Sequence, residues 1–195
     1  MTSGRNRIRR GRRPLRAHAA GPVSLAVLAL AVLALTGCGT AGYGAPVAPI
    51  PMSVSGEAFI AGTLAPRYTC QGEGINPPLN WSGAPAGTKS LALIVDDSSA
   101  PITPFIYWLV FDINPGATDI QEGSLPTGAR QALNSARQAR YDAPCPAGHR
   151  HSYRFTVYAL NTTLNLPNGA PLQAVWTAIS AATIGRGRIV VSGNP

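Results

Sequence analysis

A short polar stretch at the end of an apolar run is the clearest place for chemistry in this sequence. Leu91 to Val95 are all apolar, and Asp96 to Ser99 supply two carboxylates and two hydroxyls directly after them. Such groups accept and donate hydrogen bonds and can move protons. The chain continues through Ala100-Pro101 to a second apolar run, Phe105 to Phe111, which contains Tyr107. We therefore expect a carboxylate at the end of a core strand to face an aromatic strand across a binding or catalytic site.

Histidine is the second candidate, because an imidazole binds anions when protonated and acts as a general base when neutral. His149 and His151 follow a proline-rich loop and precede a strand, where they can equally be ordinary loop or core residues. A hydrolase could use His151 with Asp97, and a thiol enzyme could use it with Cys145. However, the sequence has no G-x-S-x-G motif and too few Cys and His for a zinc set. We expect no catalytic residues, no metal and no cofactor.

The net charge of +8 is concentrated at the start of the chain, where the first sixteen residues hold seven arginines. An apolar run of 13 residues, Val23 to Leu35, comes next; it is short for a bilayer span but suits the core of a signal peptide. The rest of the chain carries nine basic and eight acidic side chains. The high pI therefore reflects a leader, and we expect no nucleic-acid partner.

The apolar run ends in Leu35-Thr36-Gly37-Cys38, which resembles a bacterial lipobox. We predict a lipoprotein signal peptide over 1–37, a lipidated Cys38 with a flexible tether over 38–51, and one domain over 52–195. Acyl chains such as palmitate on Cys38 would anchor the domain to the cell membrane on its extracytoplasmic side. An ordinary secretory signal is the alternative, and the choice between Sec and twin-arginine export stays open.

Two cysteines, Cys70 and Cys145, remain in the exported part. An oxidising compartment favours a disulfide between them, whereas two separate buried thiols are the alternative. In the chain-entropy picture a bond closing such a loop contributes roughly 4 kcal/mol.

Further strands are expected where apolar residues alternate: Met52 to Ala61, Ser152 to Leu160 and Arg188 to Ser192. Asn114 to Gly148 is a long connection with little regular pattern. Gly185 to Arg188 (Gly-Arg-Gly-Arg) is expected to be a solvated turn.

One helix is expected near the end of the chain, over Pro171 to Ile184, because a proline stands at its start and Gly185 follows it. Its inward face should consist of Leu172, Val175, Trp176, Ile179 and Thr183. Many strands with one late helix and long loops predict a mostly β domain, a sandwich.

Several short motifs occur in a characteristic order between Phe59 and Gly193. They include Tyr68-Thr69-Cys70-x-Gly72, Asn76-Pro77-Pro78-Leu79-x-Trp81, Asp97-x-x-Ala100-Pro101, Pro144-Cys145-Pro146-x-Gly148 and His151-x-Tyr153. Together they resemble the phosphatidylethanolamine-binding protein (PEBP) family in its bacterial Raf-kinase-inhibitor-like branch. The resemblance implies a PEBP-like β-sandwich whose pocket, at one end, takes phosphate, acetate or a phosphorylated head group.

The resemblance also implies which residues form the pocket. Carried over by position, they are Asp97, Ser99, Ala100, Pro101, Tyr107, Pro146, His151 and Tyr153. Ser99 stands where the family has a second Asp, and Tyr107 stands where it has a pocket His. Ser98 and Ser152 replace a Pro and an Arg. We expect a small, neutral, hydroxyl-lined pocket with His151 as its titratable cation, and a weaker preference for anions than the family norm.

These observations predict a lipid-anchored, non-catalytic protein that binds a small anionic ligand or a phospholipid head group. The alternative is a protein-interaction or inhibitor module of the kinase- or protease-inhibitor kind, with a degenerate pocket and a protein partner. A hydrolase using His151 and Asp97 is a third reading.

Overall fold

The computed structural model describes residues 48–100, 102–146, 148 and 150–193. The predicted signal peptide, Cys38 and the tether up to residue 47 lie outside the described residues, as do Pro101 and His149. None of the helices formed by the described residues is long and apolar enough to cross a membrane.

Four long antiparallel strands form the centre of a large sheet. In spatial order they are β11 (Thr183–Gly193), β10 (His151–Leu160), β6 (Ser90–Asp97) and β7 (Phe105–Ile113). All residues of β6 are buried, because the strand has a partner on each edge and is covered on both faces. This confirms the predicted core strand after Ser90. The sheet is completed by β1 (Ile50–Pro51), β3 (Phe59–Ile60), β4 (Thr63–Leu64) and β9 (Arg130–Gln131).

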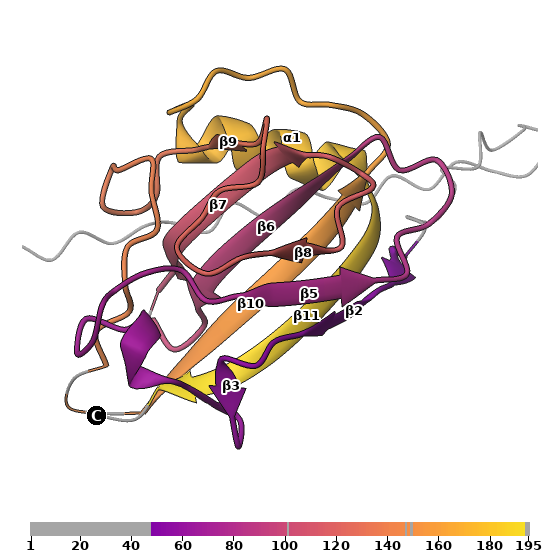
Figure 1. Ribbon diagram of the computed structural model, residues 1–195. Helices are drawn as coiled ribbons and strands as arrows, with labels where there is room; N and C mark the ends of the chain where they lie inside the picture. Colours follow the sequence, from indigo (N-terminus) through magenta and orange to yellow (C-terminus); the bar gives the residue numbers. More distant parts are fainter. Residues whose placement is uncertain (1–47, 101, 147, 149, 194–195) are drawn as a thin grey trace, which may run out of the picture. The chain divides into compact units, whose positions relative to one another are not determined.

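A second, small sheet lies over one face of the large sheet, and a helix lies over the other face (Figure 1). The small sheet consists of β2 (Ser53–Ser55), β5 (Leu79–Ser82) and β8 (Asp119–Ile120). The helix is α1 (Leu172–Ala182). The predicted mostly β sandwich with one late helix is therefore confirmed.

The alternation of β10 divides the interior into two cores, because successive side chains of a strand point to opposite faces. Tyr153, Phe155, Val157 and Ala159 belong to the core between the two sheets, as the sequence predicted. Tyr158 and Leu160 belong to the core beneath α1. One face of the large sheet thus packs against the small sheet, and the other face packs against α1.

The predicted inward face of the helix is partly wrong. Val175, Ile179 and Ala182 are buried, but Trp176 is 39% exposed and Thr183 already belongs to β11. Trp176 instead borders a groove between the start of α1 and the large sheet. The helix covers only part of the sheet, so a side chain on its apolar stripe can still lie beyond the covered area.

Gly185 to Arg188 is a strand and not the expected solvated turn, because β11 already begins at Thr183. A Cβ at Gly185 would lie 2.7 Å from Pro85 Cδ, and a Cβ at Gly187 would lie 2.7 Å from the Met52 carbonyl oxygen. The two glycines therefore allow another part of the chain to approach this face closely. Arg186 and Arg188 point to the opposite face.

The expected first strand, Met52 to Ala61, is divided between the two sheets. Its first part is β2 of the small sheet, and its later part is β3 of the large sheet. Gly56 lies between them, so close to Pro78 that an added Cβ would be 2.8 Å from the Pro78 carbonyl oxygen. The long connection Asn114 to Gly148 has little regular structure, as predicted, apart from the two-residue strands β8 and β9.

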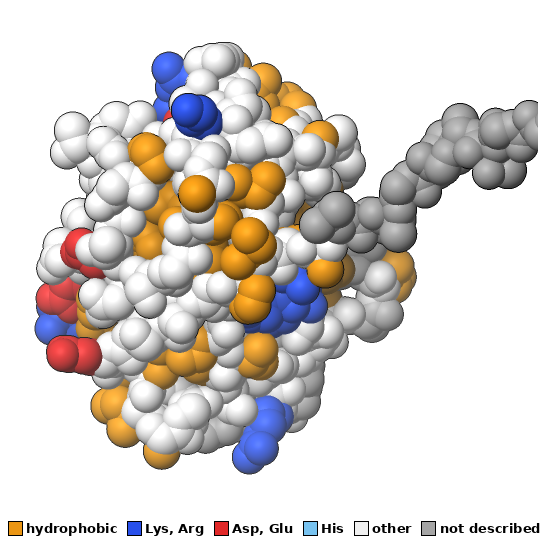
Figure 2. Space-filling view, turned by 90° about the vertical axis from the view of Figure 1, so that its right-hand side faces the viewer, with side chains coloured by type: hydrophobic (Ala, Val, Ile, Leu, Met, Phe, Trp, Pro, Cys, Tyr) orange, Lys and Arg blue, Asp and Glu red, His pale blue; other side chains and the backbone are white. Residues whose placement is uncertain are grey.

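Charged side chains are dispersed on the face of the molecule shown in Figure 2. Hydrophobic side chains gather over the middle of that face, while basic and acidic side chains stand in small groups. This face therefore offers no broad patch of one sign for a polyanion.

A disulfide joins two loops at one end of the sandwich. Cys70 and Cys145 are bonded, with their Cα atoms 5.2 Å apart, and they are 75 positions apart in the sequence. Beside the bond, the Cys70 backbone N–H donates to the Pro144 carbonyl at 3.0 Å. The loop after the 3₁₀ helix η1 (Pro66–Tyr68) is thereby held against the proline-rich loop before β10.

We expect the double substitution Cys70→Ser/Cys145→Ser to lower the free energy of unfolding by roughly 4 kcal/mol, because a long loop is no longer closed in the unfolded chain. Urea unfolding followed by tryptophan fluorescence measures the change. Wild type under reducing conditions is the matched control and should lose a similar amount. Equal stability of the oxidised and reduced wild type would contradict this prediction.

Candidate functional site

The predicted site lies where four strands of the large sheet end together. β6 ends at Asp97 and β11 ends at Gly193, while β7 begins at Phe105 and β10 begins at His151. Because neighbouring strands are antiparallel, these positions share one end of the sheet. Residues that are far apart in the sequence thereby come together.

Asp97 and His151 form the polar centre of this end. His151 Nδ1 lies 2.6 Å from Asp97 Oδ2, and the exposed fractions of the two side chains are 15% and 5%. The other carboxylate oxygen, Asp97 Oδ1, accepts the Ser99 backbone N–H at 2.8 Å. A buried carboxylate is stable only when its oxygens are paired in this way.

Two opposing effects set the pKa of Asp97. Burial raises it, but the hydrogen bonds from His151, the Ser99 backbone and the Ser152 backbone lower it by more, so the pKa of Asp97 is below its ordinary value. The carboxylate is therefore ionised at neutral pH. The carboxylate is bonded to Nδ1 of the His151 ring and keeps a negative charge beside that ring.

Two tyrosines lie beside this pair. Tyr107 of β7 meets Tyr153 of β10 edge-on, with ring centroids 5.7 Å apart, and the His151 ring stacks on Tyr153 at 5.8 Å. Burial, together with the charges of Asp97 and Asp142, raises the pKa of Tyr107 to about 12. Burial also raises the pKa of Tyr153, with Tyr107 and Asp97 adding to the effect. Both phenols are thus neutral and able to donate a hydrogen bond.

The Tyr153 hydroxyl is unusual among the buried polar groups. Its oxygen is inaccessible to solvent and has no hydrogen-bond partner among the described residues. The group lies against Gly193, where an added Cβ would be 2.9 Å from the hydroxyl oxygen. A buried hydroxyl without a partner costs roughly 1–3 kcal/mol, so it requires an explanation.

Gly193 also lines a small cavity of about 210 Å³. The cavity is lined by Thr63, Leu64, Pro66, Thr69, Gln71, Pro146 and Gly193. No ionisable side chain belongs to this lining, whose polar groups are hydroxyls, one amide and backbone. Its volume is below the usual 300–1,000 Å³ of pockets for drug-sized ligands, so it fits only a small group.

The structure brings together most of the residues that the sequence assigned to the pocket. Asp97, Tyr107, His151 and Tyr153 form one cluster, and Ser99 supplies its backbone to it. The Ser99 hydroxyl takes no part in that contact. Ala100 follows in the same turn and is half-buried, whereas Pro101 lies outside the described residues. Pro146 lines the neighbouring cavity instead of the cluster.

Sequence reasoning missed the other wall of the cavity, which comes from Thr63, Thr69 and Gln71. One signal was available. Thr69 and Gln71 flank Cys70, and a bond between Cys70 and Cys145 places them next to Pro146. The loop around Cys70 therefore forms one wall of the cavity next to the cluster.

The described part of the site offers neutral hydrogen-bond donors and an imidazole paired with a carboxylate. Cys145 is in a disulfide, so it cannot serve as a thiolate nucleophile for His151. No group of three or more Cys, His, Asp or Glu among the described residues could hold a metal ion. The arrangement suits the binding of a small polar or anionic group by a histidine and two neutral phenols.

Replacing the buried carboxylate should expose its contribution to stability. We expect Asp97→Asn to lose about 2 kcal/mol of unfolding free energy near neutral pH, since charge-assisted hydrogen bonds are lost. Because the pKa of Asp97 is lowered in the folded protein, the advantage of wild type is present above the ordinary pKa of 3.8 and disappears as the pH falls below it. Urea unfolding at several pH values between about 7 and 2.5 measures this.

The exposed Glu57→Gln is the matched control and should leave the stability within about 0.5 kcal/mol of wild type. A deficit of Asp97→Asn that stays constant down to the lowest pH would show that the carboxylate charge is not the stabilising feature.

Comparison with known proteins identifies relatives of the whole domain. Residues 55–193 match the family described as "Phosphatidylethanolamine-binding protein". A "UPF0098 protein" of Methanothermobacter thermautotrophicus is 40% identical over 134 residues, which are 66% of this chain and 89% of that protein. The "Putative lipoprotein LppC" of Mycobacterium tuberculosis is 36% identical over 191 residues, covering 87% of this chain and 94% of that protein.

Solved structures agree with the sequence matches. The PEBP homolog CT736 of Chlamydia trachomatis superposes with a TM-score of 0.68 at 32% identity, covering 74% of this chain and 98% of that one. YbcL of E. coli, described as a member of the mammalian PEBP family, gives a TM-score of 0.69 at 27% identity with the same coverage of both chains. The shared fold, the ordered motifs around Asp97 and His151 and these matches lead to one conclusion: the chain belongs to the phosphatidylethanolamine-binding protein family.

Proposed function

We propose that this protein is a lipid-anchored, non-catalytic binding protein that holds a small anion or a phosphorylated head group at the Asp97/His151 end of the sandwich. The observation that carries the proposal is the buried Tyr153 hydroxyl without a partner among the described residues. A ligand oxygen that reaches this hydroxyl when the chain at Gly193 moves aside would accept its hydrogen bond and offset the cost of burying it.

The charges around the site support a weakly anion-preferring pocket. The His151 ring lies against the ionised Asp97, whose negative charge limits the attraction of the site for an anion. Tyr107 and Tyr153 add neutral donors. Neutral donors bind an anion less strongly than an additional charged donor does, so we expect millimolar rather than micromolar affinity.

Tyr141, which is partly buried, and the buried Tyr153 give a matched test, since the hydroxyl of Tyr141 has a partner and that of Tyr153 has none among the described residues. Tyr141 donates to the Tyr68 carbonyl at 2.8 Å, so Tyr141→Phe should lose about 1 kcal/mol of stability. Tyr153→Phe should leave stability unchanged or increase it, but should weaken binding of inorganic phosphate and phosphoethanolamine by roughly tenfold. Urea unfolding and NMR titration measure the two effects.

The opposite pattern would contradict the proposal. If Tyr153→Phe destabilises the fold as much as Tyr141→Phe and does not change the affinity for either ligand, the Tyr153 hydroxyl has an internal partner and is not a ligand donor. Phosphoethanolamine binding more tightly than inorganic phosphate would indicate a head group, and equal affinities would indicate a free anion.

A second candidate function is a protein-interaction or inhibitor module with a degenerate pocket. The observation that favours it is the chemistry of two positions: Ser99 contributes only its backbone N–H to Asp97, and Tyr107 is a neutral phenol. Tyr107 lacks the positive charge that the His implied by the resemblance could carry, and Ser99 lacks the side-chain carboxylate implied at its position, so the pocket has lost two of the family's polar side chains. Absence of phosphate and phosphoethanolamine binding up to about 10 mM would favour this candidate over the first.

Lipid anchoring rests on the Leu35-Thr36-Gly37-Cys38 sequence and is supported by the similarity to a relative whose name describes it as a lipoprotein. We expect the wild-type chain to incorporate an alkyne analogue of palmitate and to partition into the detergent phase in Triton X-114 extraction. Cys38→Ser should lose both properties, because no thioether can form. Cys70→Ser is the matched control and should still be labelled. Labelling of the Cys38→Ser variant would place the lipid elsewhere.

A further inference from the structure

A groove on the helix-covered face of the large sheet is separate from the Asp97/His151 site. It has a volume of about 440 Å³, within the usual range for organic ligands. Ile94 and Ile106 of the sheet line it on one side, and Leu172 and Trp176 from the start of α1 line it on the other. These four side chains make the groove predominantly apolar.

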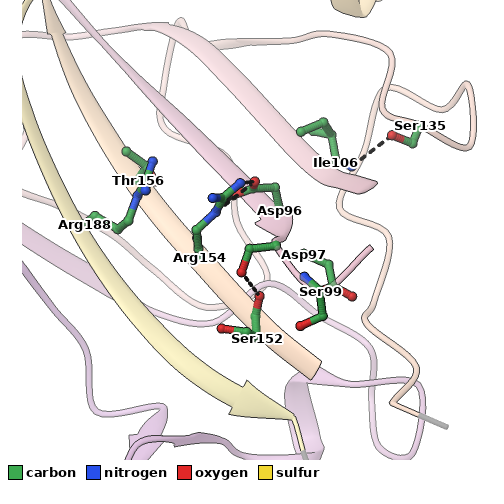
Figure 3. Close-up of polar contacts among 10 residues, drawn as sticks. Asp96, Asp97, Ser99, Ile106, Ser135, Ser152, Arg154, Thr156 and Arg188 are labelled. Atoms are coloured by element: carbon green, nitrogen blue, oxygen red, sulfur yellow. Dashed lines mark hydrogen bonds and ion pairs between the residues drawn. The ribbon is translucent and has the colours of Figure 1, made fainter. Parts of the chain in front are cut away.

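The floor of the groove contains an ion pair that is already satisfied. Arg154 of β10 grips the Asp96 carboxylate through Nε and Nη2, with Nε 3.1 and 3.0 Å from its two oxygens (Figure 3). Asp96 is only 5% exposed. Its negative charge is therefore neutralised within the protein and does not repel an anion from the groove.

Arg188 adds a second guanidinium at the rim of the groove. Its Nε donates to Thr156 Oγ1 at 2.8 Å, which holds the side chain beside Arg154 on the same face of the sheet (Figure 3). A guanidinium has five N–H donors; Arg188 uses one for Thr156 and also bonds the Tyr158 side chain, which leaves further N–H groups for a ligand. With Asp96 paired to Arg154, the charged side chains that line the groove have one excess positive charge.

Trp176 provides an exposed apolar surface that a ligand bound in the groove would contact. Its ring is 39% exposed, and its edge-on contact with Tyr158, at a centroid distance of 6.3 Å, leaves part of the indole at the groove. A large aromatic side chain exposed beside arginines is a favourable contact for a flat apolar group that carries a negative charge.

We propose that this groove binds an aromatic carboxylate, with the ring between Ile106 and Trp176 and the carboxylate on Arg188. The occupant follows from charge complementarity: apolar walls on both sides, one internally neutralised ion pair and one additional guanidinium match an organic monoanion. Binding here is independent of the pocket around Asp97 and His151, because Asp96 and Asp97 are consecutive on β6 and point to opposite faces of the sheet.

The probe for this site is 1-naphthylacetate, with the neutral 1-naphthaleneethanol as its uncharged counterpart. The full-length chain, labelled with 5-fluorotryptophan and held in zwitterionic lipid nanodiscs, reports binding by ¹⁹F NMR. Trp81 and Trp108 are buried and Trp176 is exposed, so naphthyl binding in the groove should shift the Trp176 resonance alone. Trp176→Phe assigns that resonance.

Arg188→Gln and Arg186→Gln form a matched pair, since both arginines lie on β11 and point to the same face but only Arg188 lines the groove. We expect Arg188→Gln to weaken 1-naphthylacetate binding by roughly tenfold and to leave 1-naphthaleneethanol binding within about twofold of wild type. Arg186→Gln should leave the affinity for both compounds within about twofold of wild type.

Four results would each overturn the proposal. They are no shift of the Trp176 resonance at about 10 mM 1-naphthylacetate, an equal loss of affinity in the two arginine variants, displacement of 1-naphthylacetate by inorganic phosphate, and a Trp176 resonance that depends on protein concentration without any ligand. The third result would place the compound at the Asp97/His151 site, and the last would assign the groove to a second copy of the chain.

Discussion

The pairing register between β6 and β10 determines the chemistry on both faces of the large sheet. Asp96 lies opposite Arg154 and Asp97 lies opposite Tyr153, so the two consecutive carboxylates point to different faces. Each meets a basic side chain from β10: Arg154 on the helix side and His151 on the side of the small sheet. A shift by one residue would turn every side chain of β6, both carboxylates included, to the opposite face of the sheet, which is why this register is strongly specified.

Because Asp96 and Asp97 are buried, their carboxylates need hydrogen-bond partners, and these partners also fix the geometry of the site. Bonds from His151 and two backbone groups lower the pKa of Asp97, and the bond from His151 also orients the imidazole. The disulfide between Cys70 and Cys145 acts at longer range, since it fixes the loops that line the adjacent cavity. A rigid strand end and a cross-linked loop thus form one small binding region.

Ser99 and Tyr107 differ from the residues that the family resemblance implies at their positions. They change the chemistry of the pocket more than its shape. Ser99 still closes the turn, because the bond to Asp97 comes from its backbone N–H. Tyr107 still packs in the site, edge-on to Tyr153, but it stays neutral at all physiological pH values. What changes is the charge available to a ligand, and this is the reason for proposing a weak anion preference and not a different fold.

The family resemblance implied that Asp97 and His151 share one site, whereas the sequence by itself determined the strands and the helix with strong periodicity. Their patterns are local, and a strand such as Ser152 to Leu160 shows its two faces in its own residues. Only the tertiary structure decided that Trp176 faces a groove and that Gly185 to Arg188 is a strand. Helical periodicity defines an apolar stripe but not how much of it a neighbour covers. Alternating glycine and arginine is typical of a turn until Met52 and Pro85 lie against the glycines.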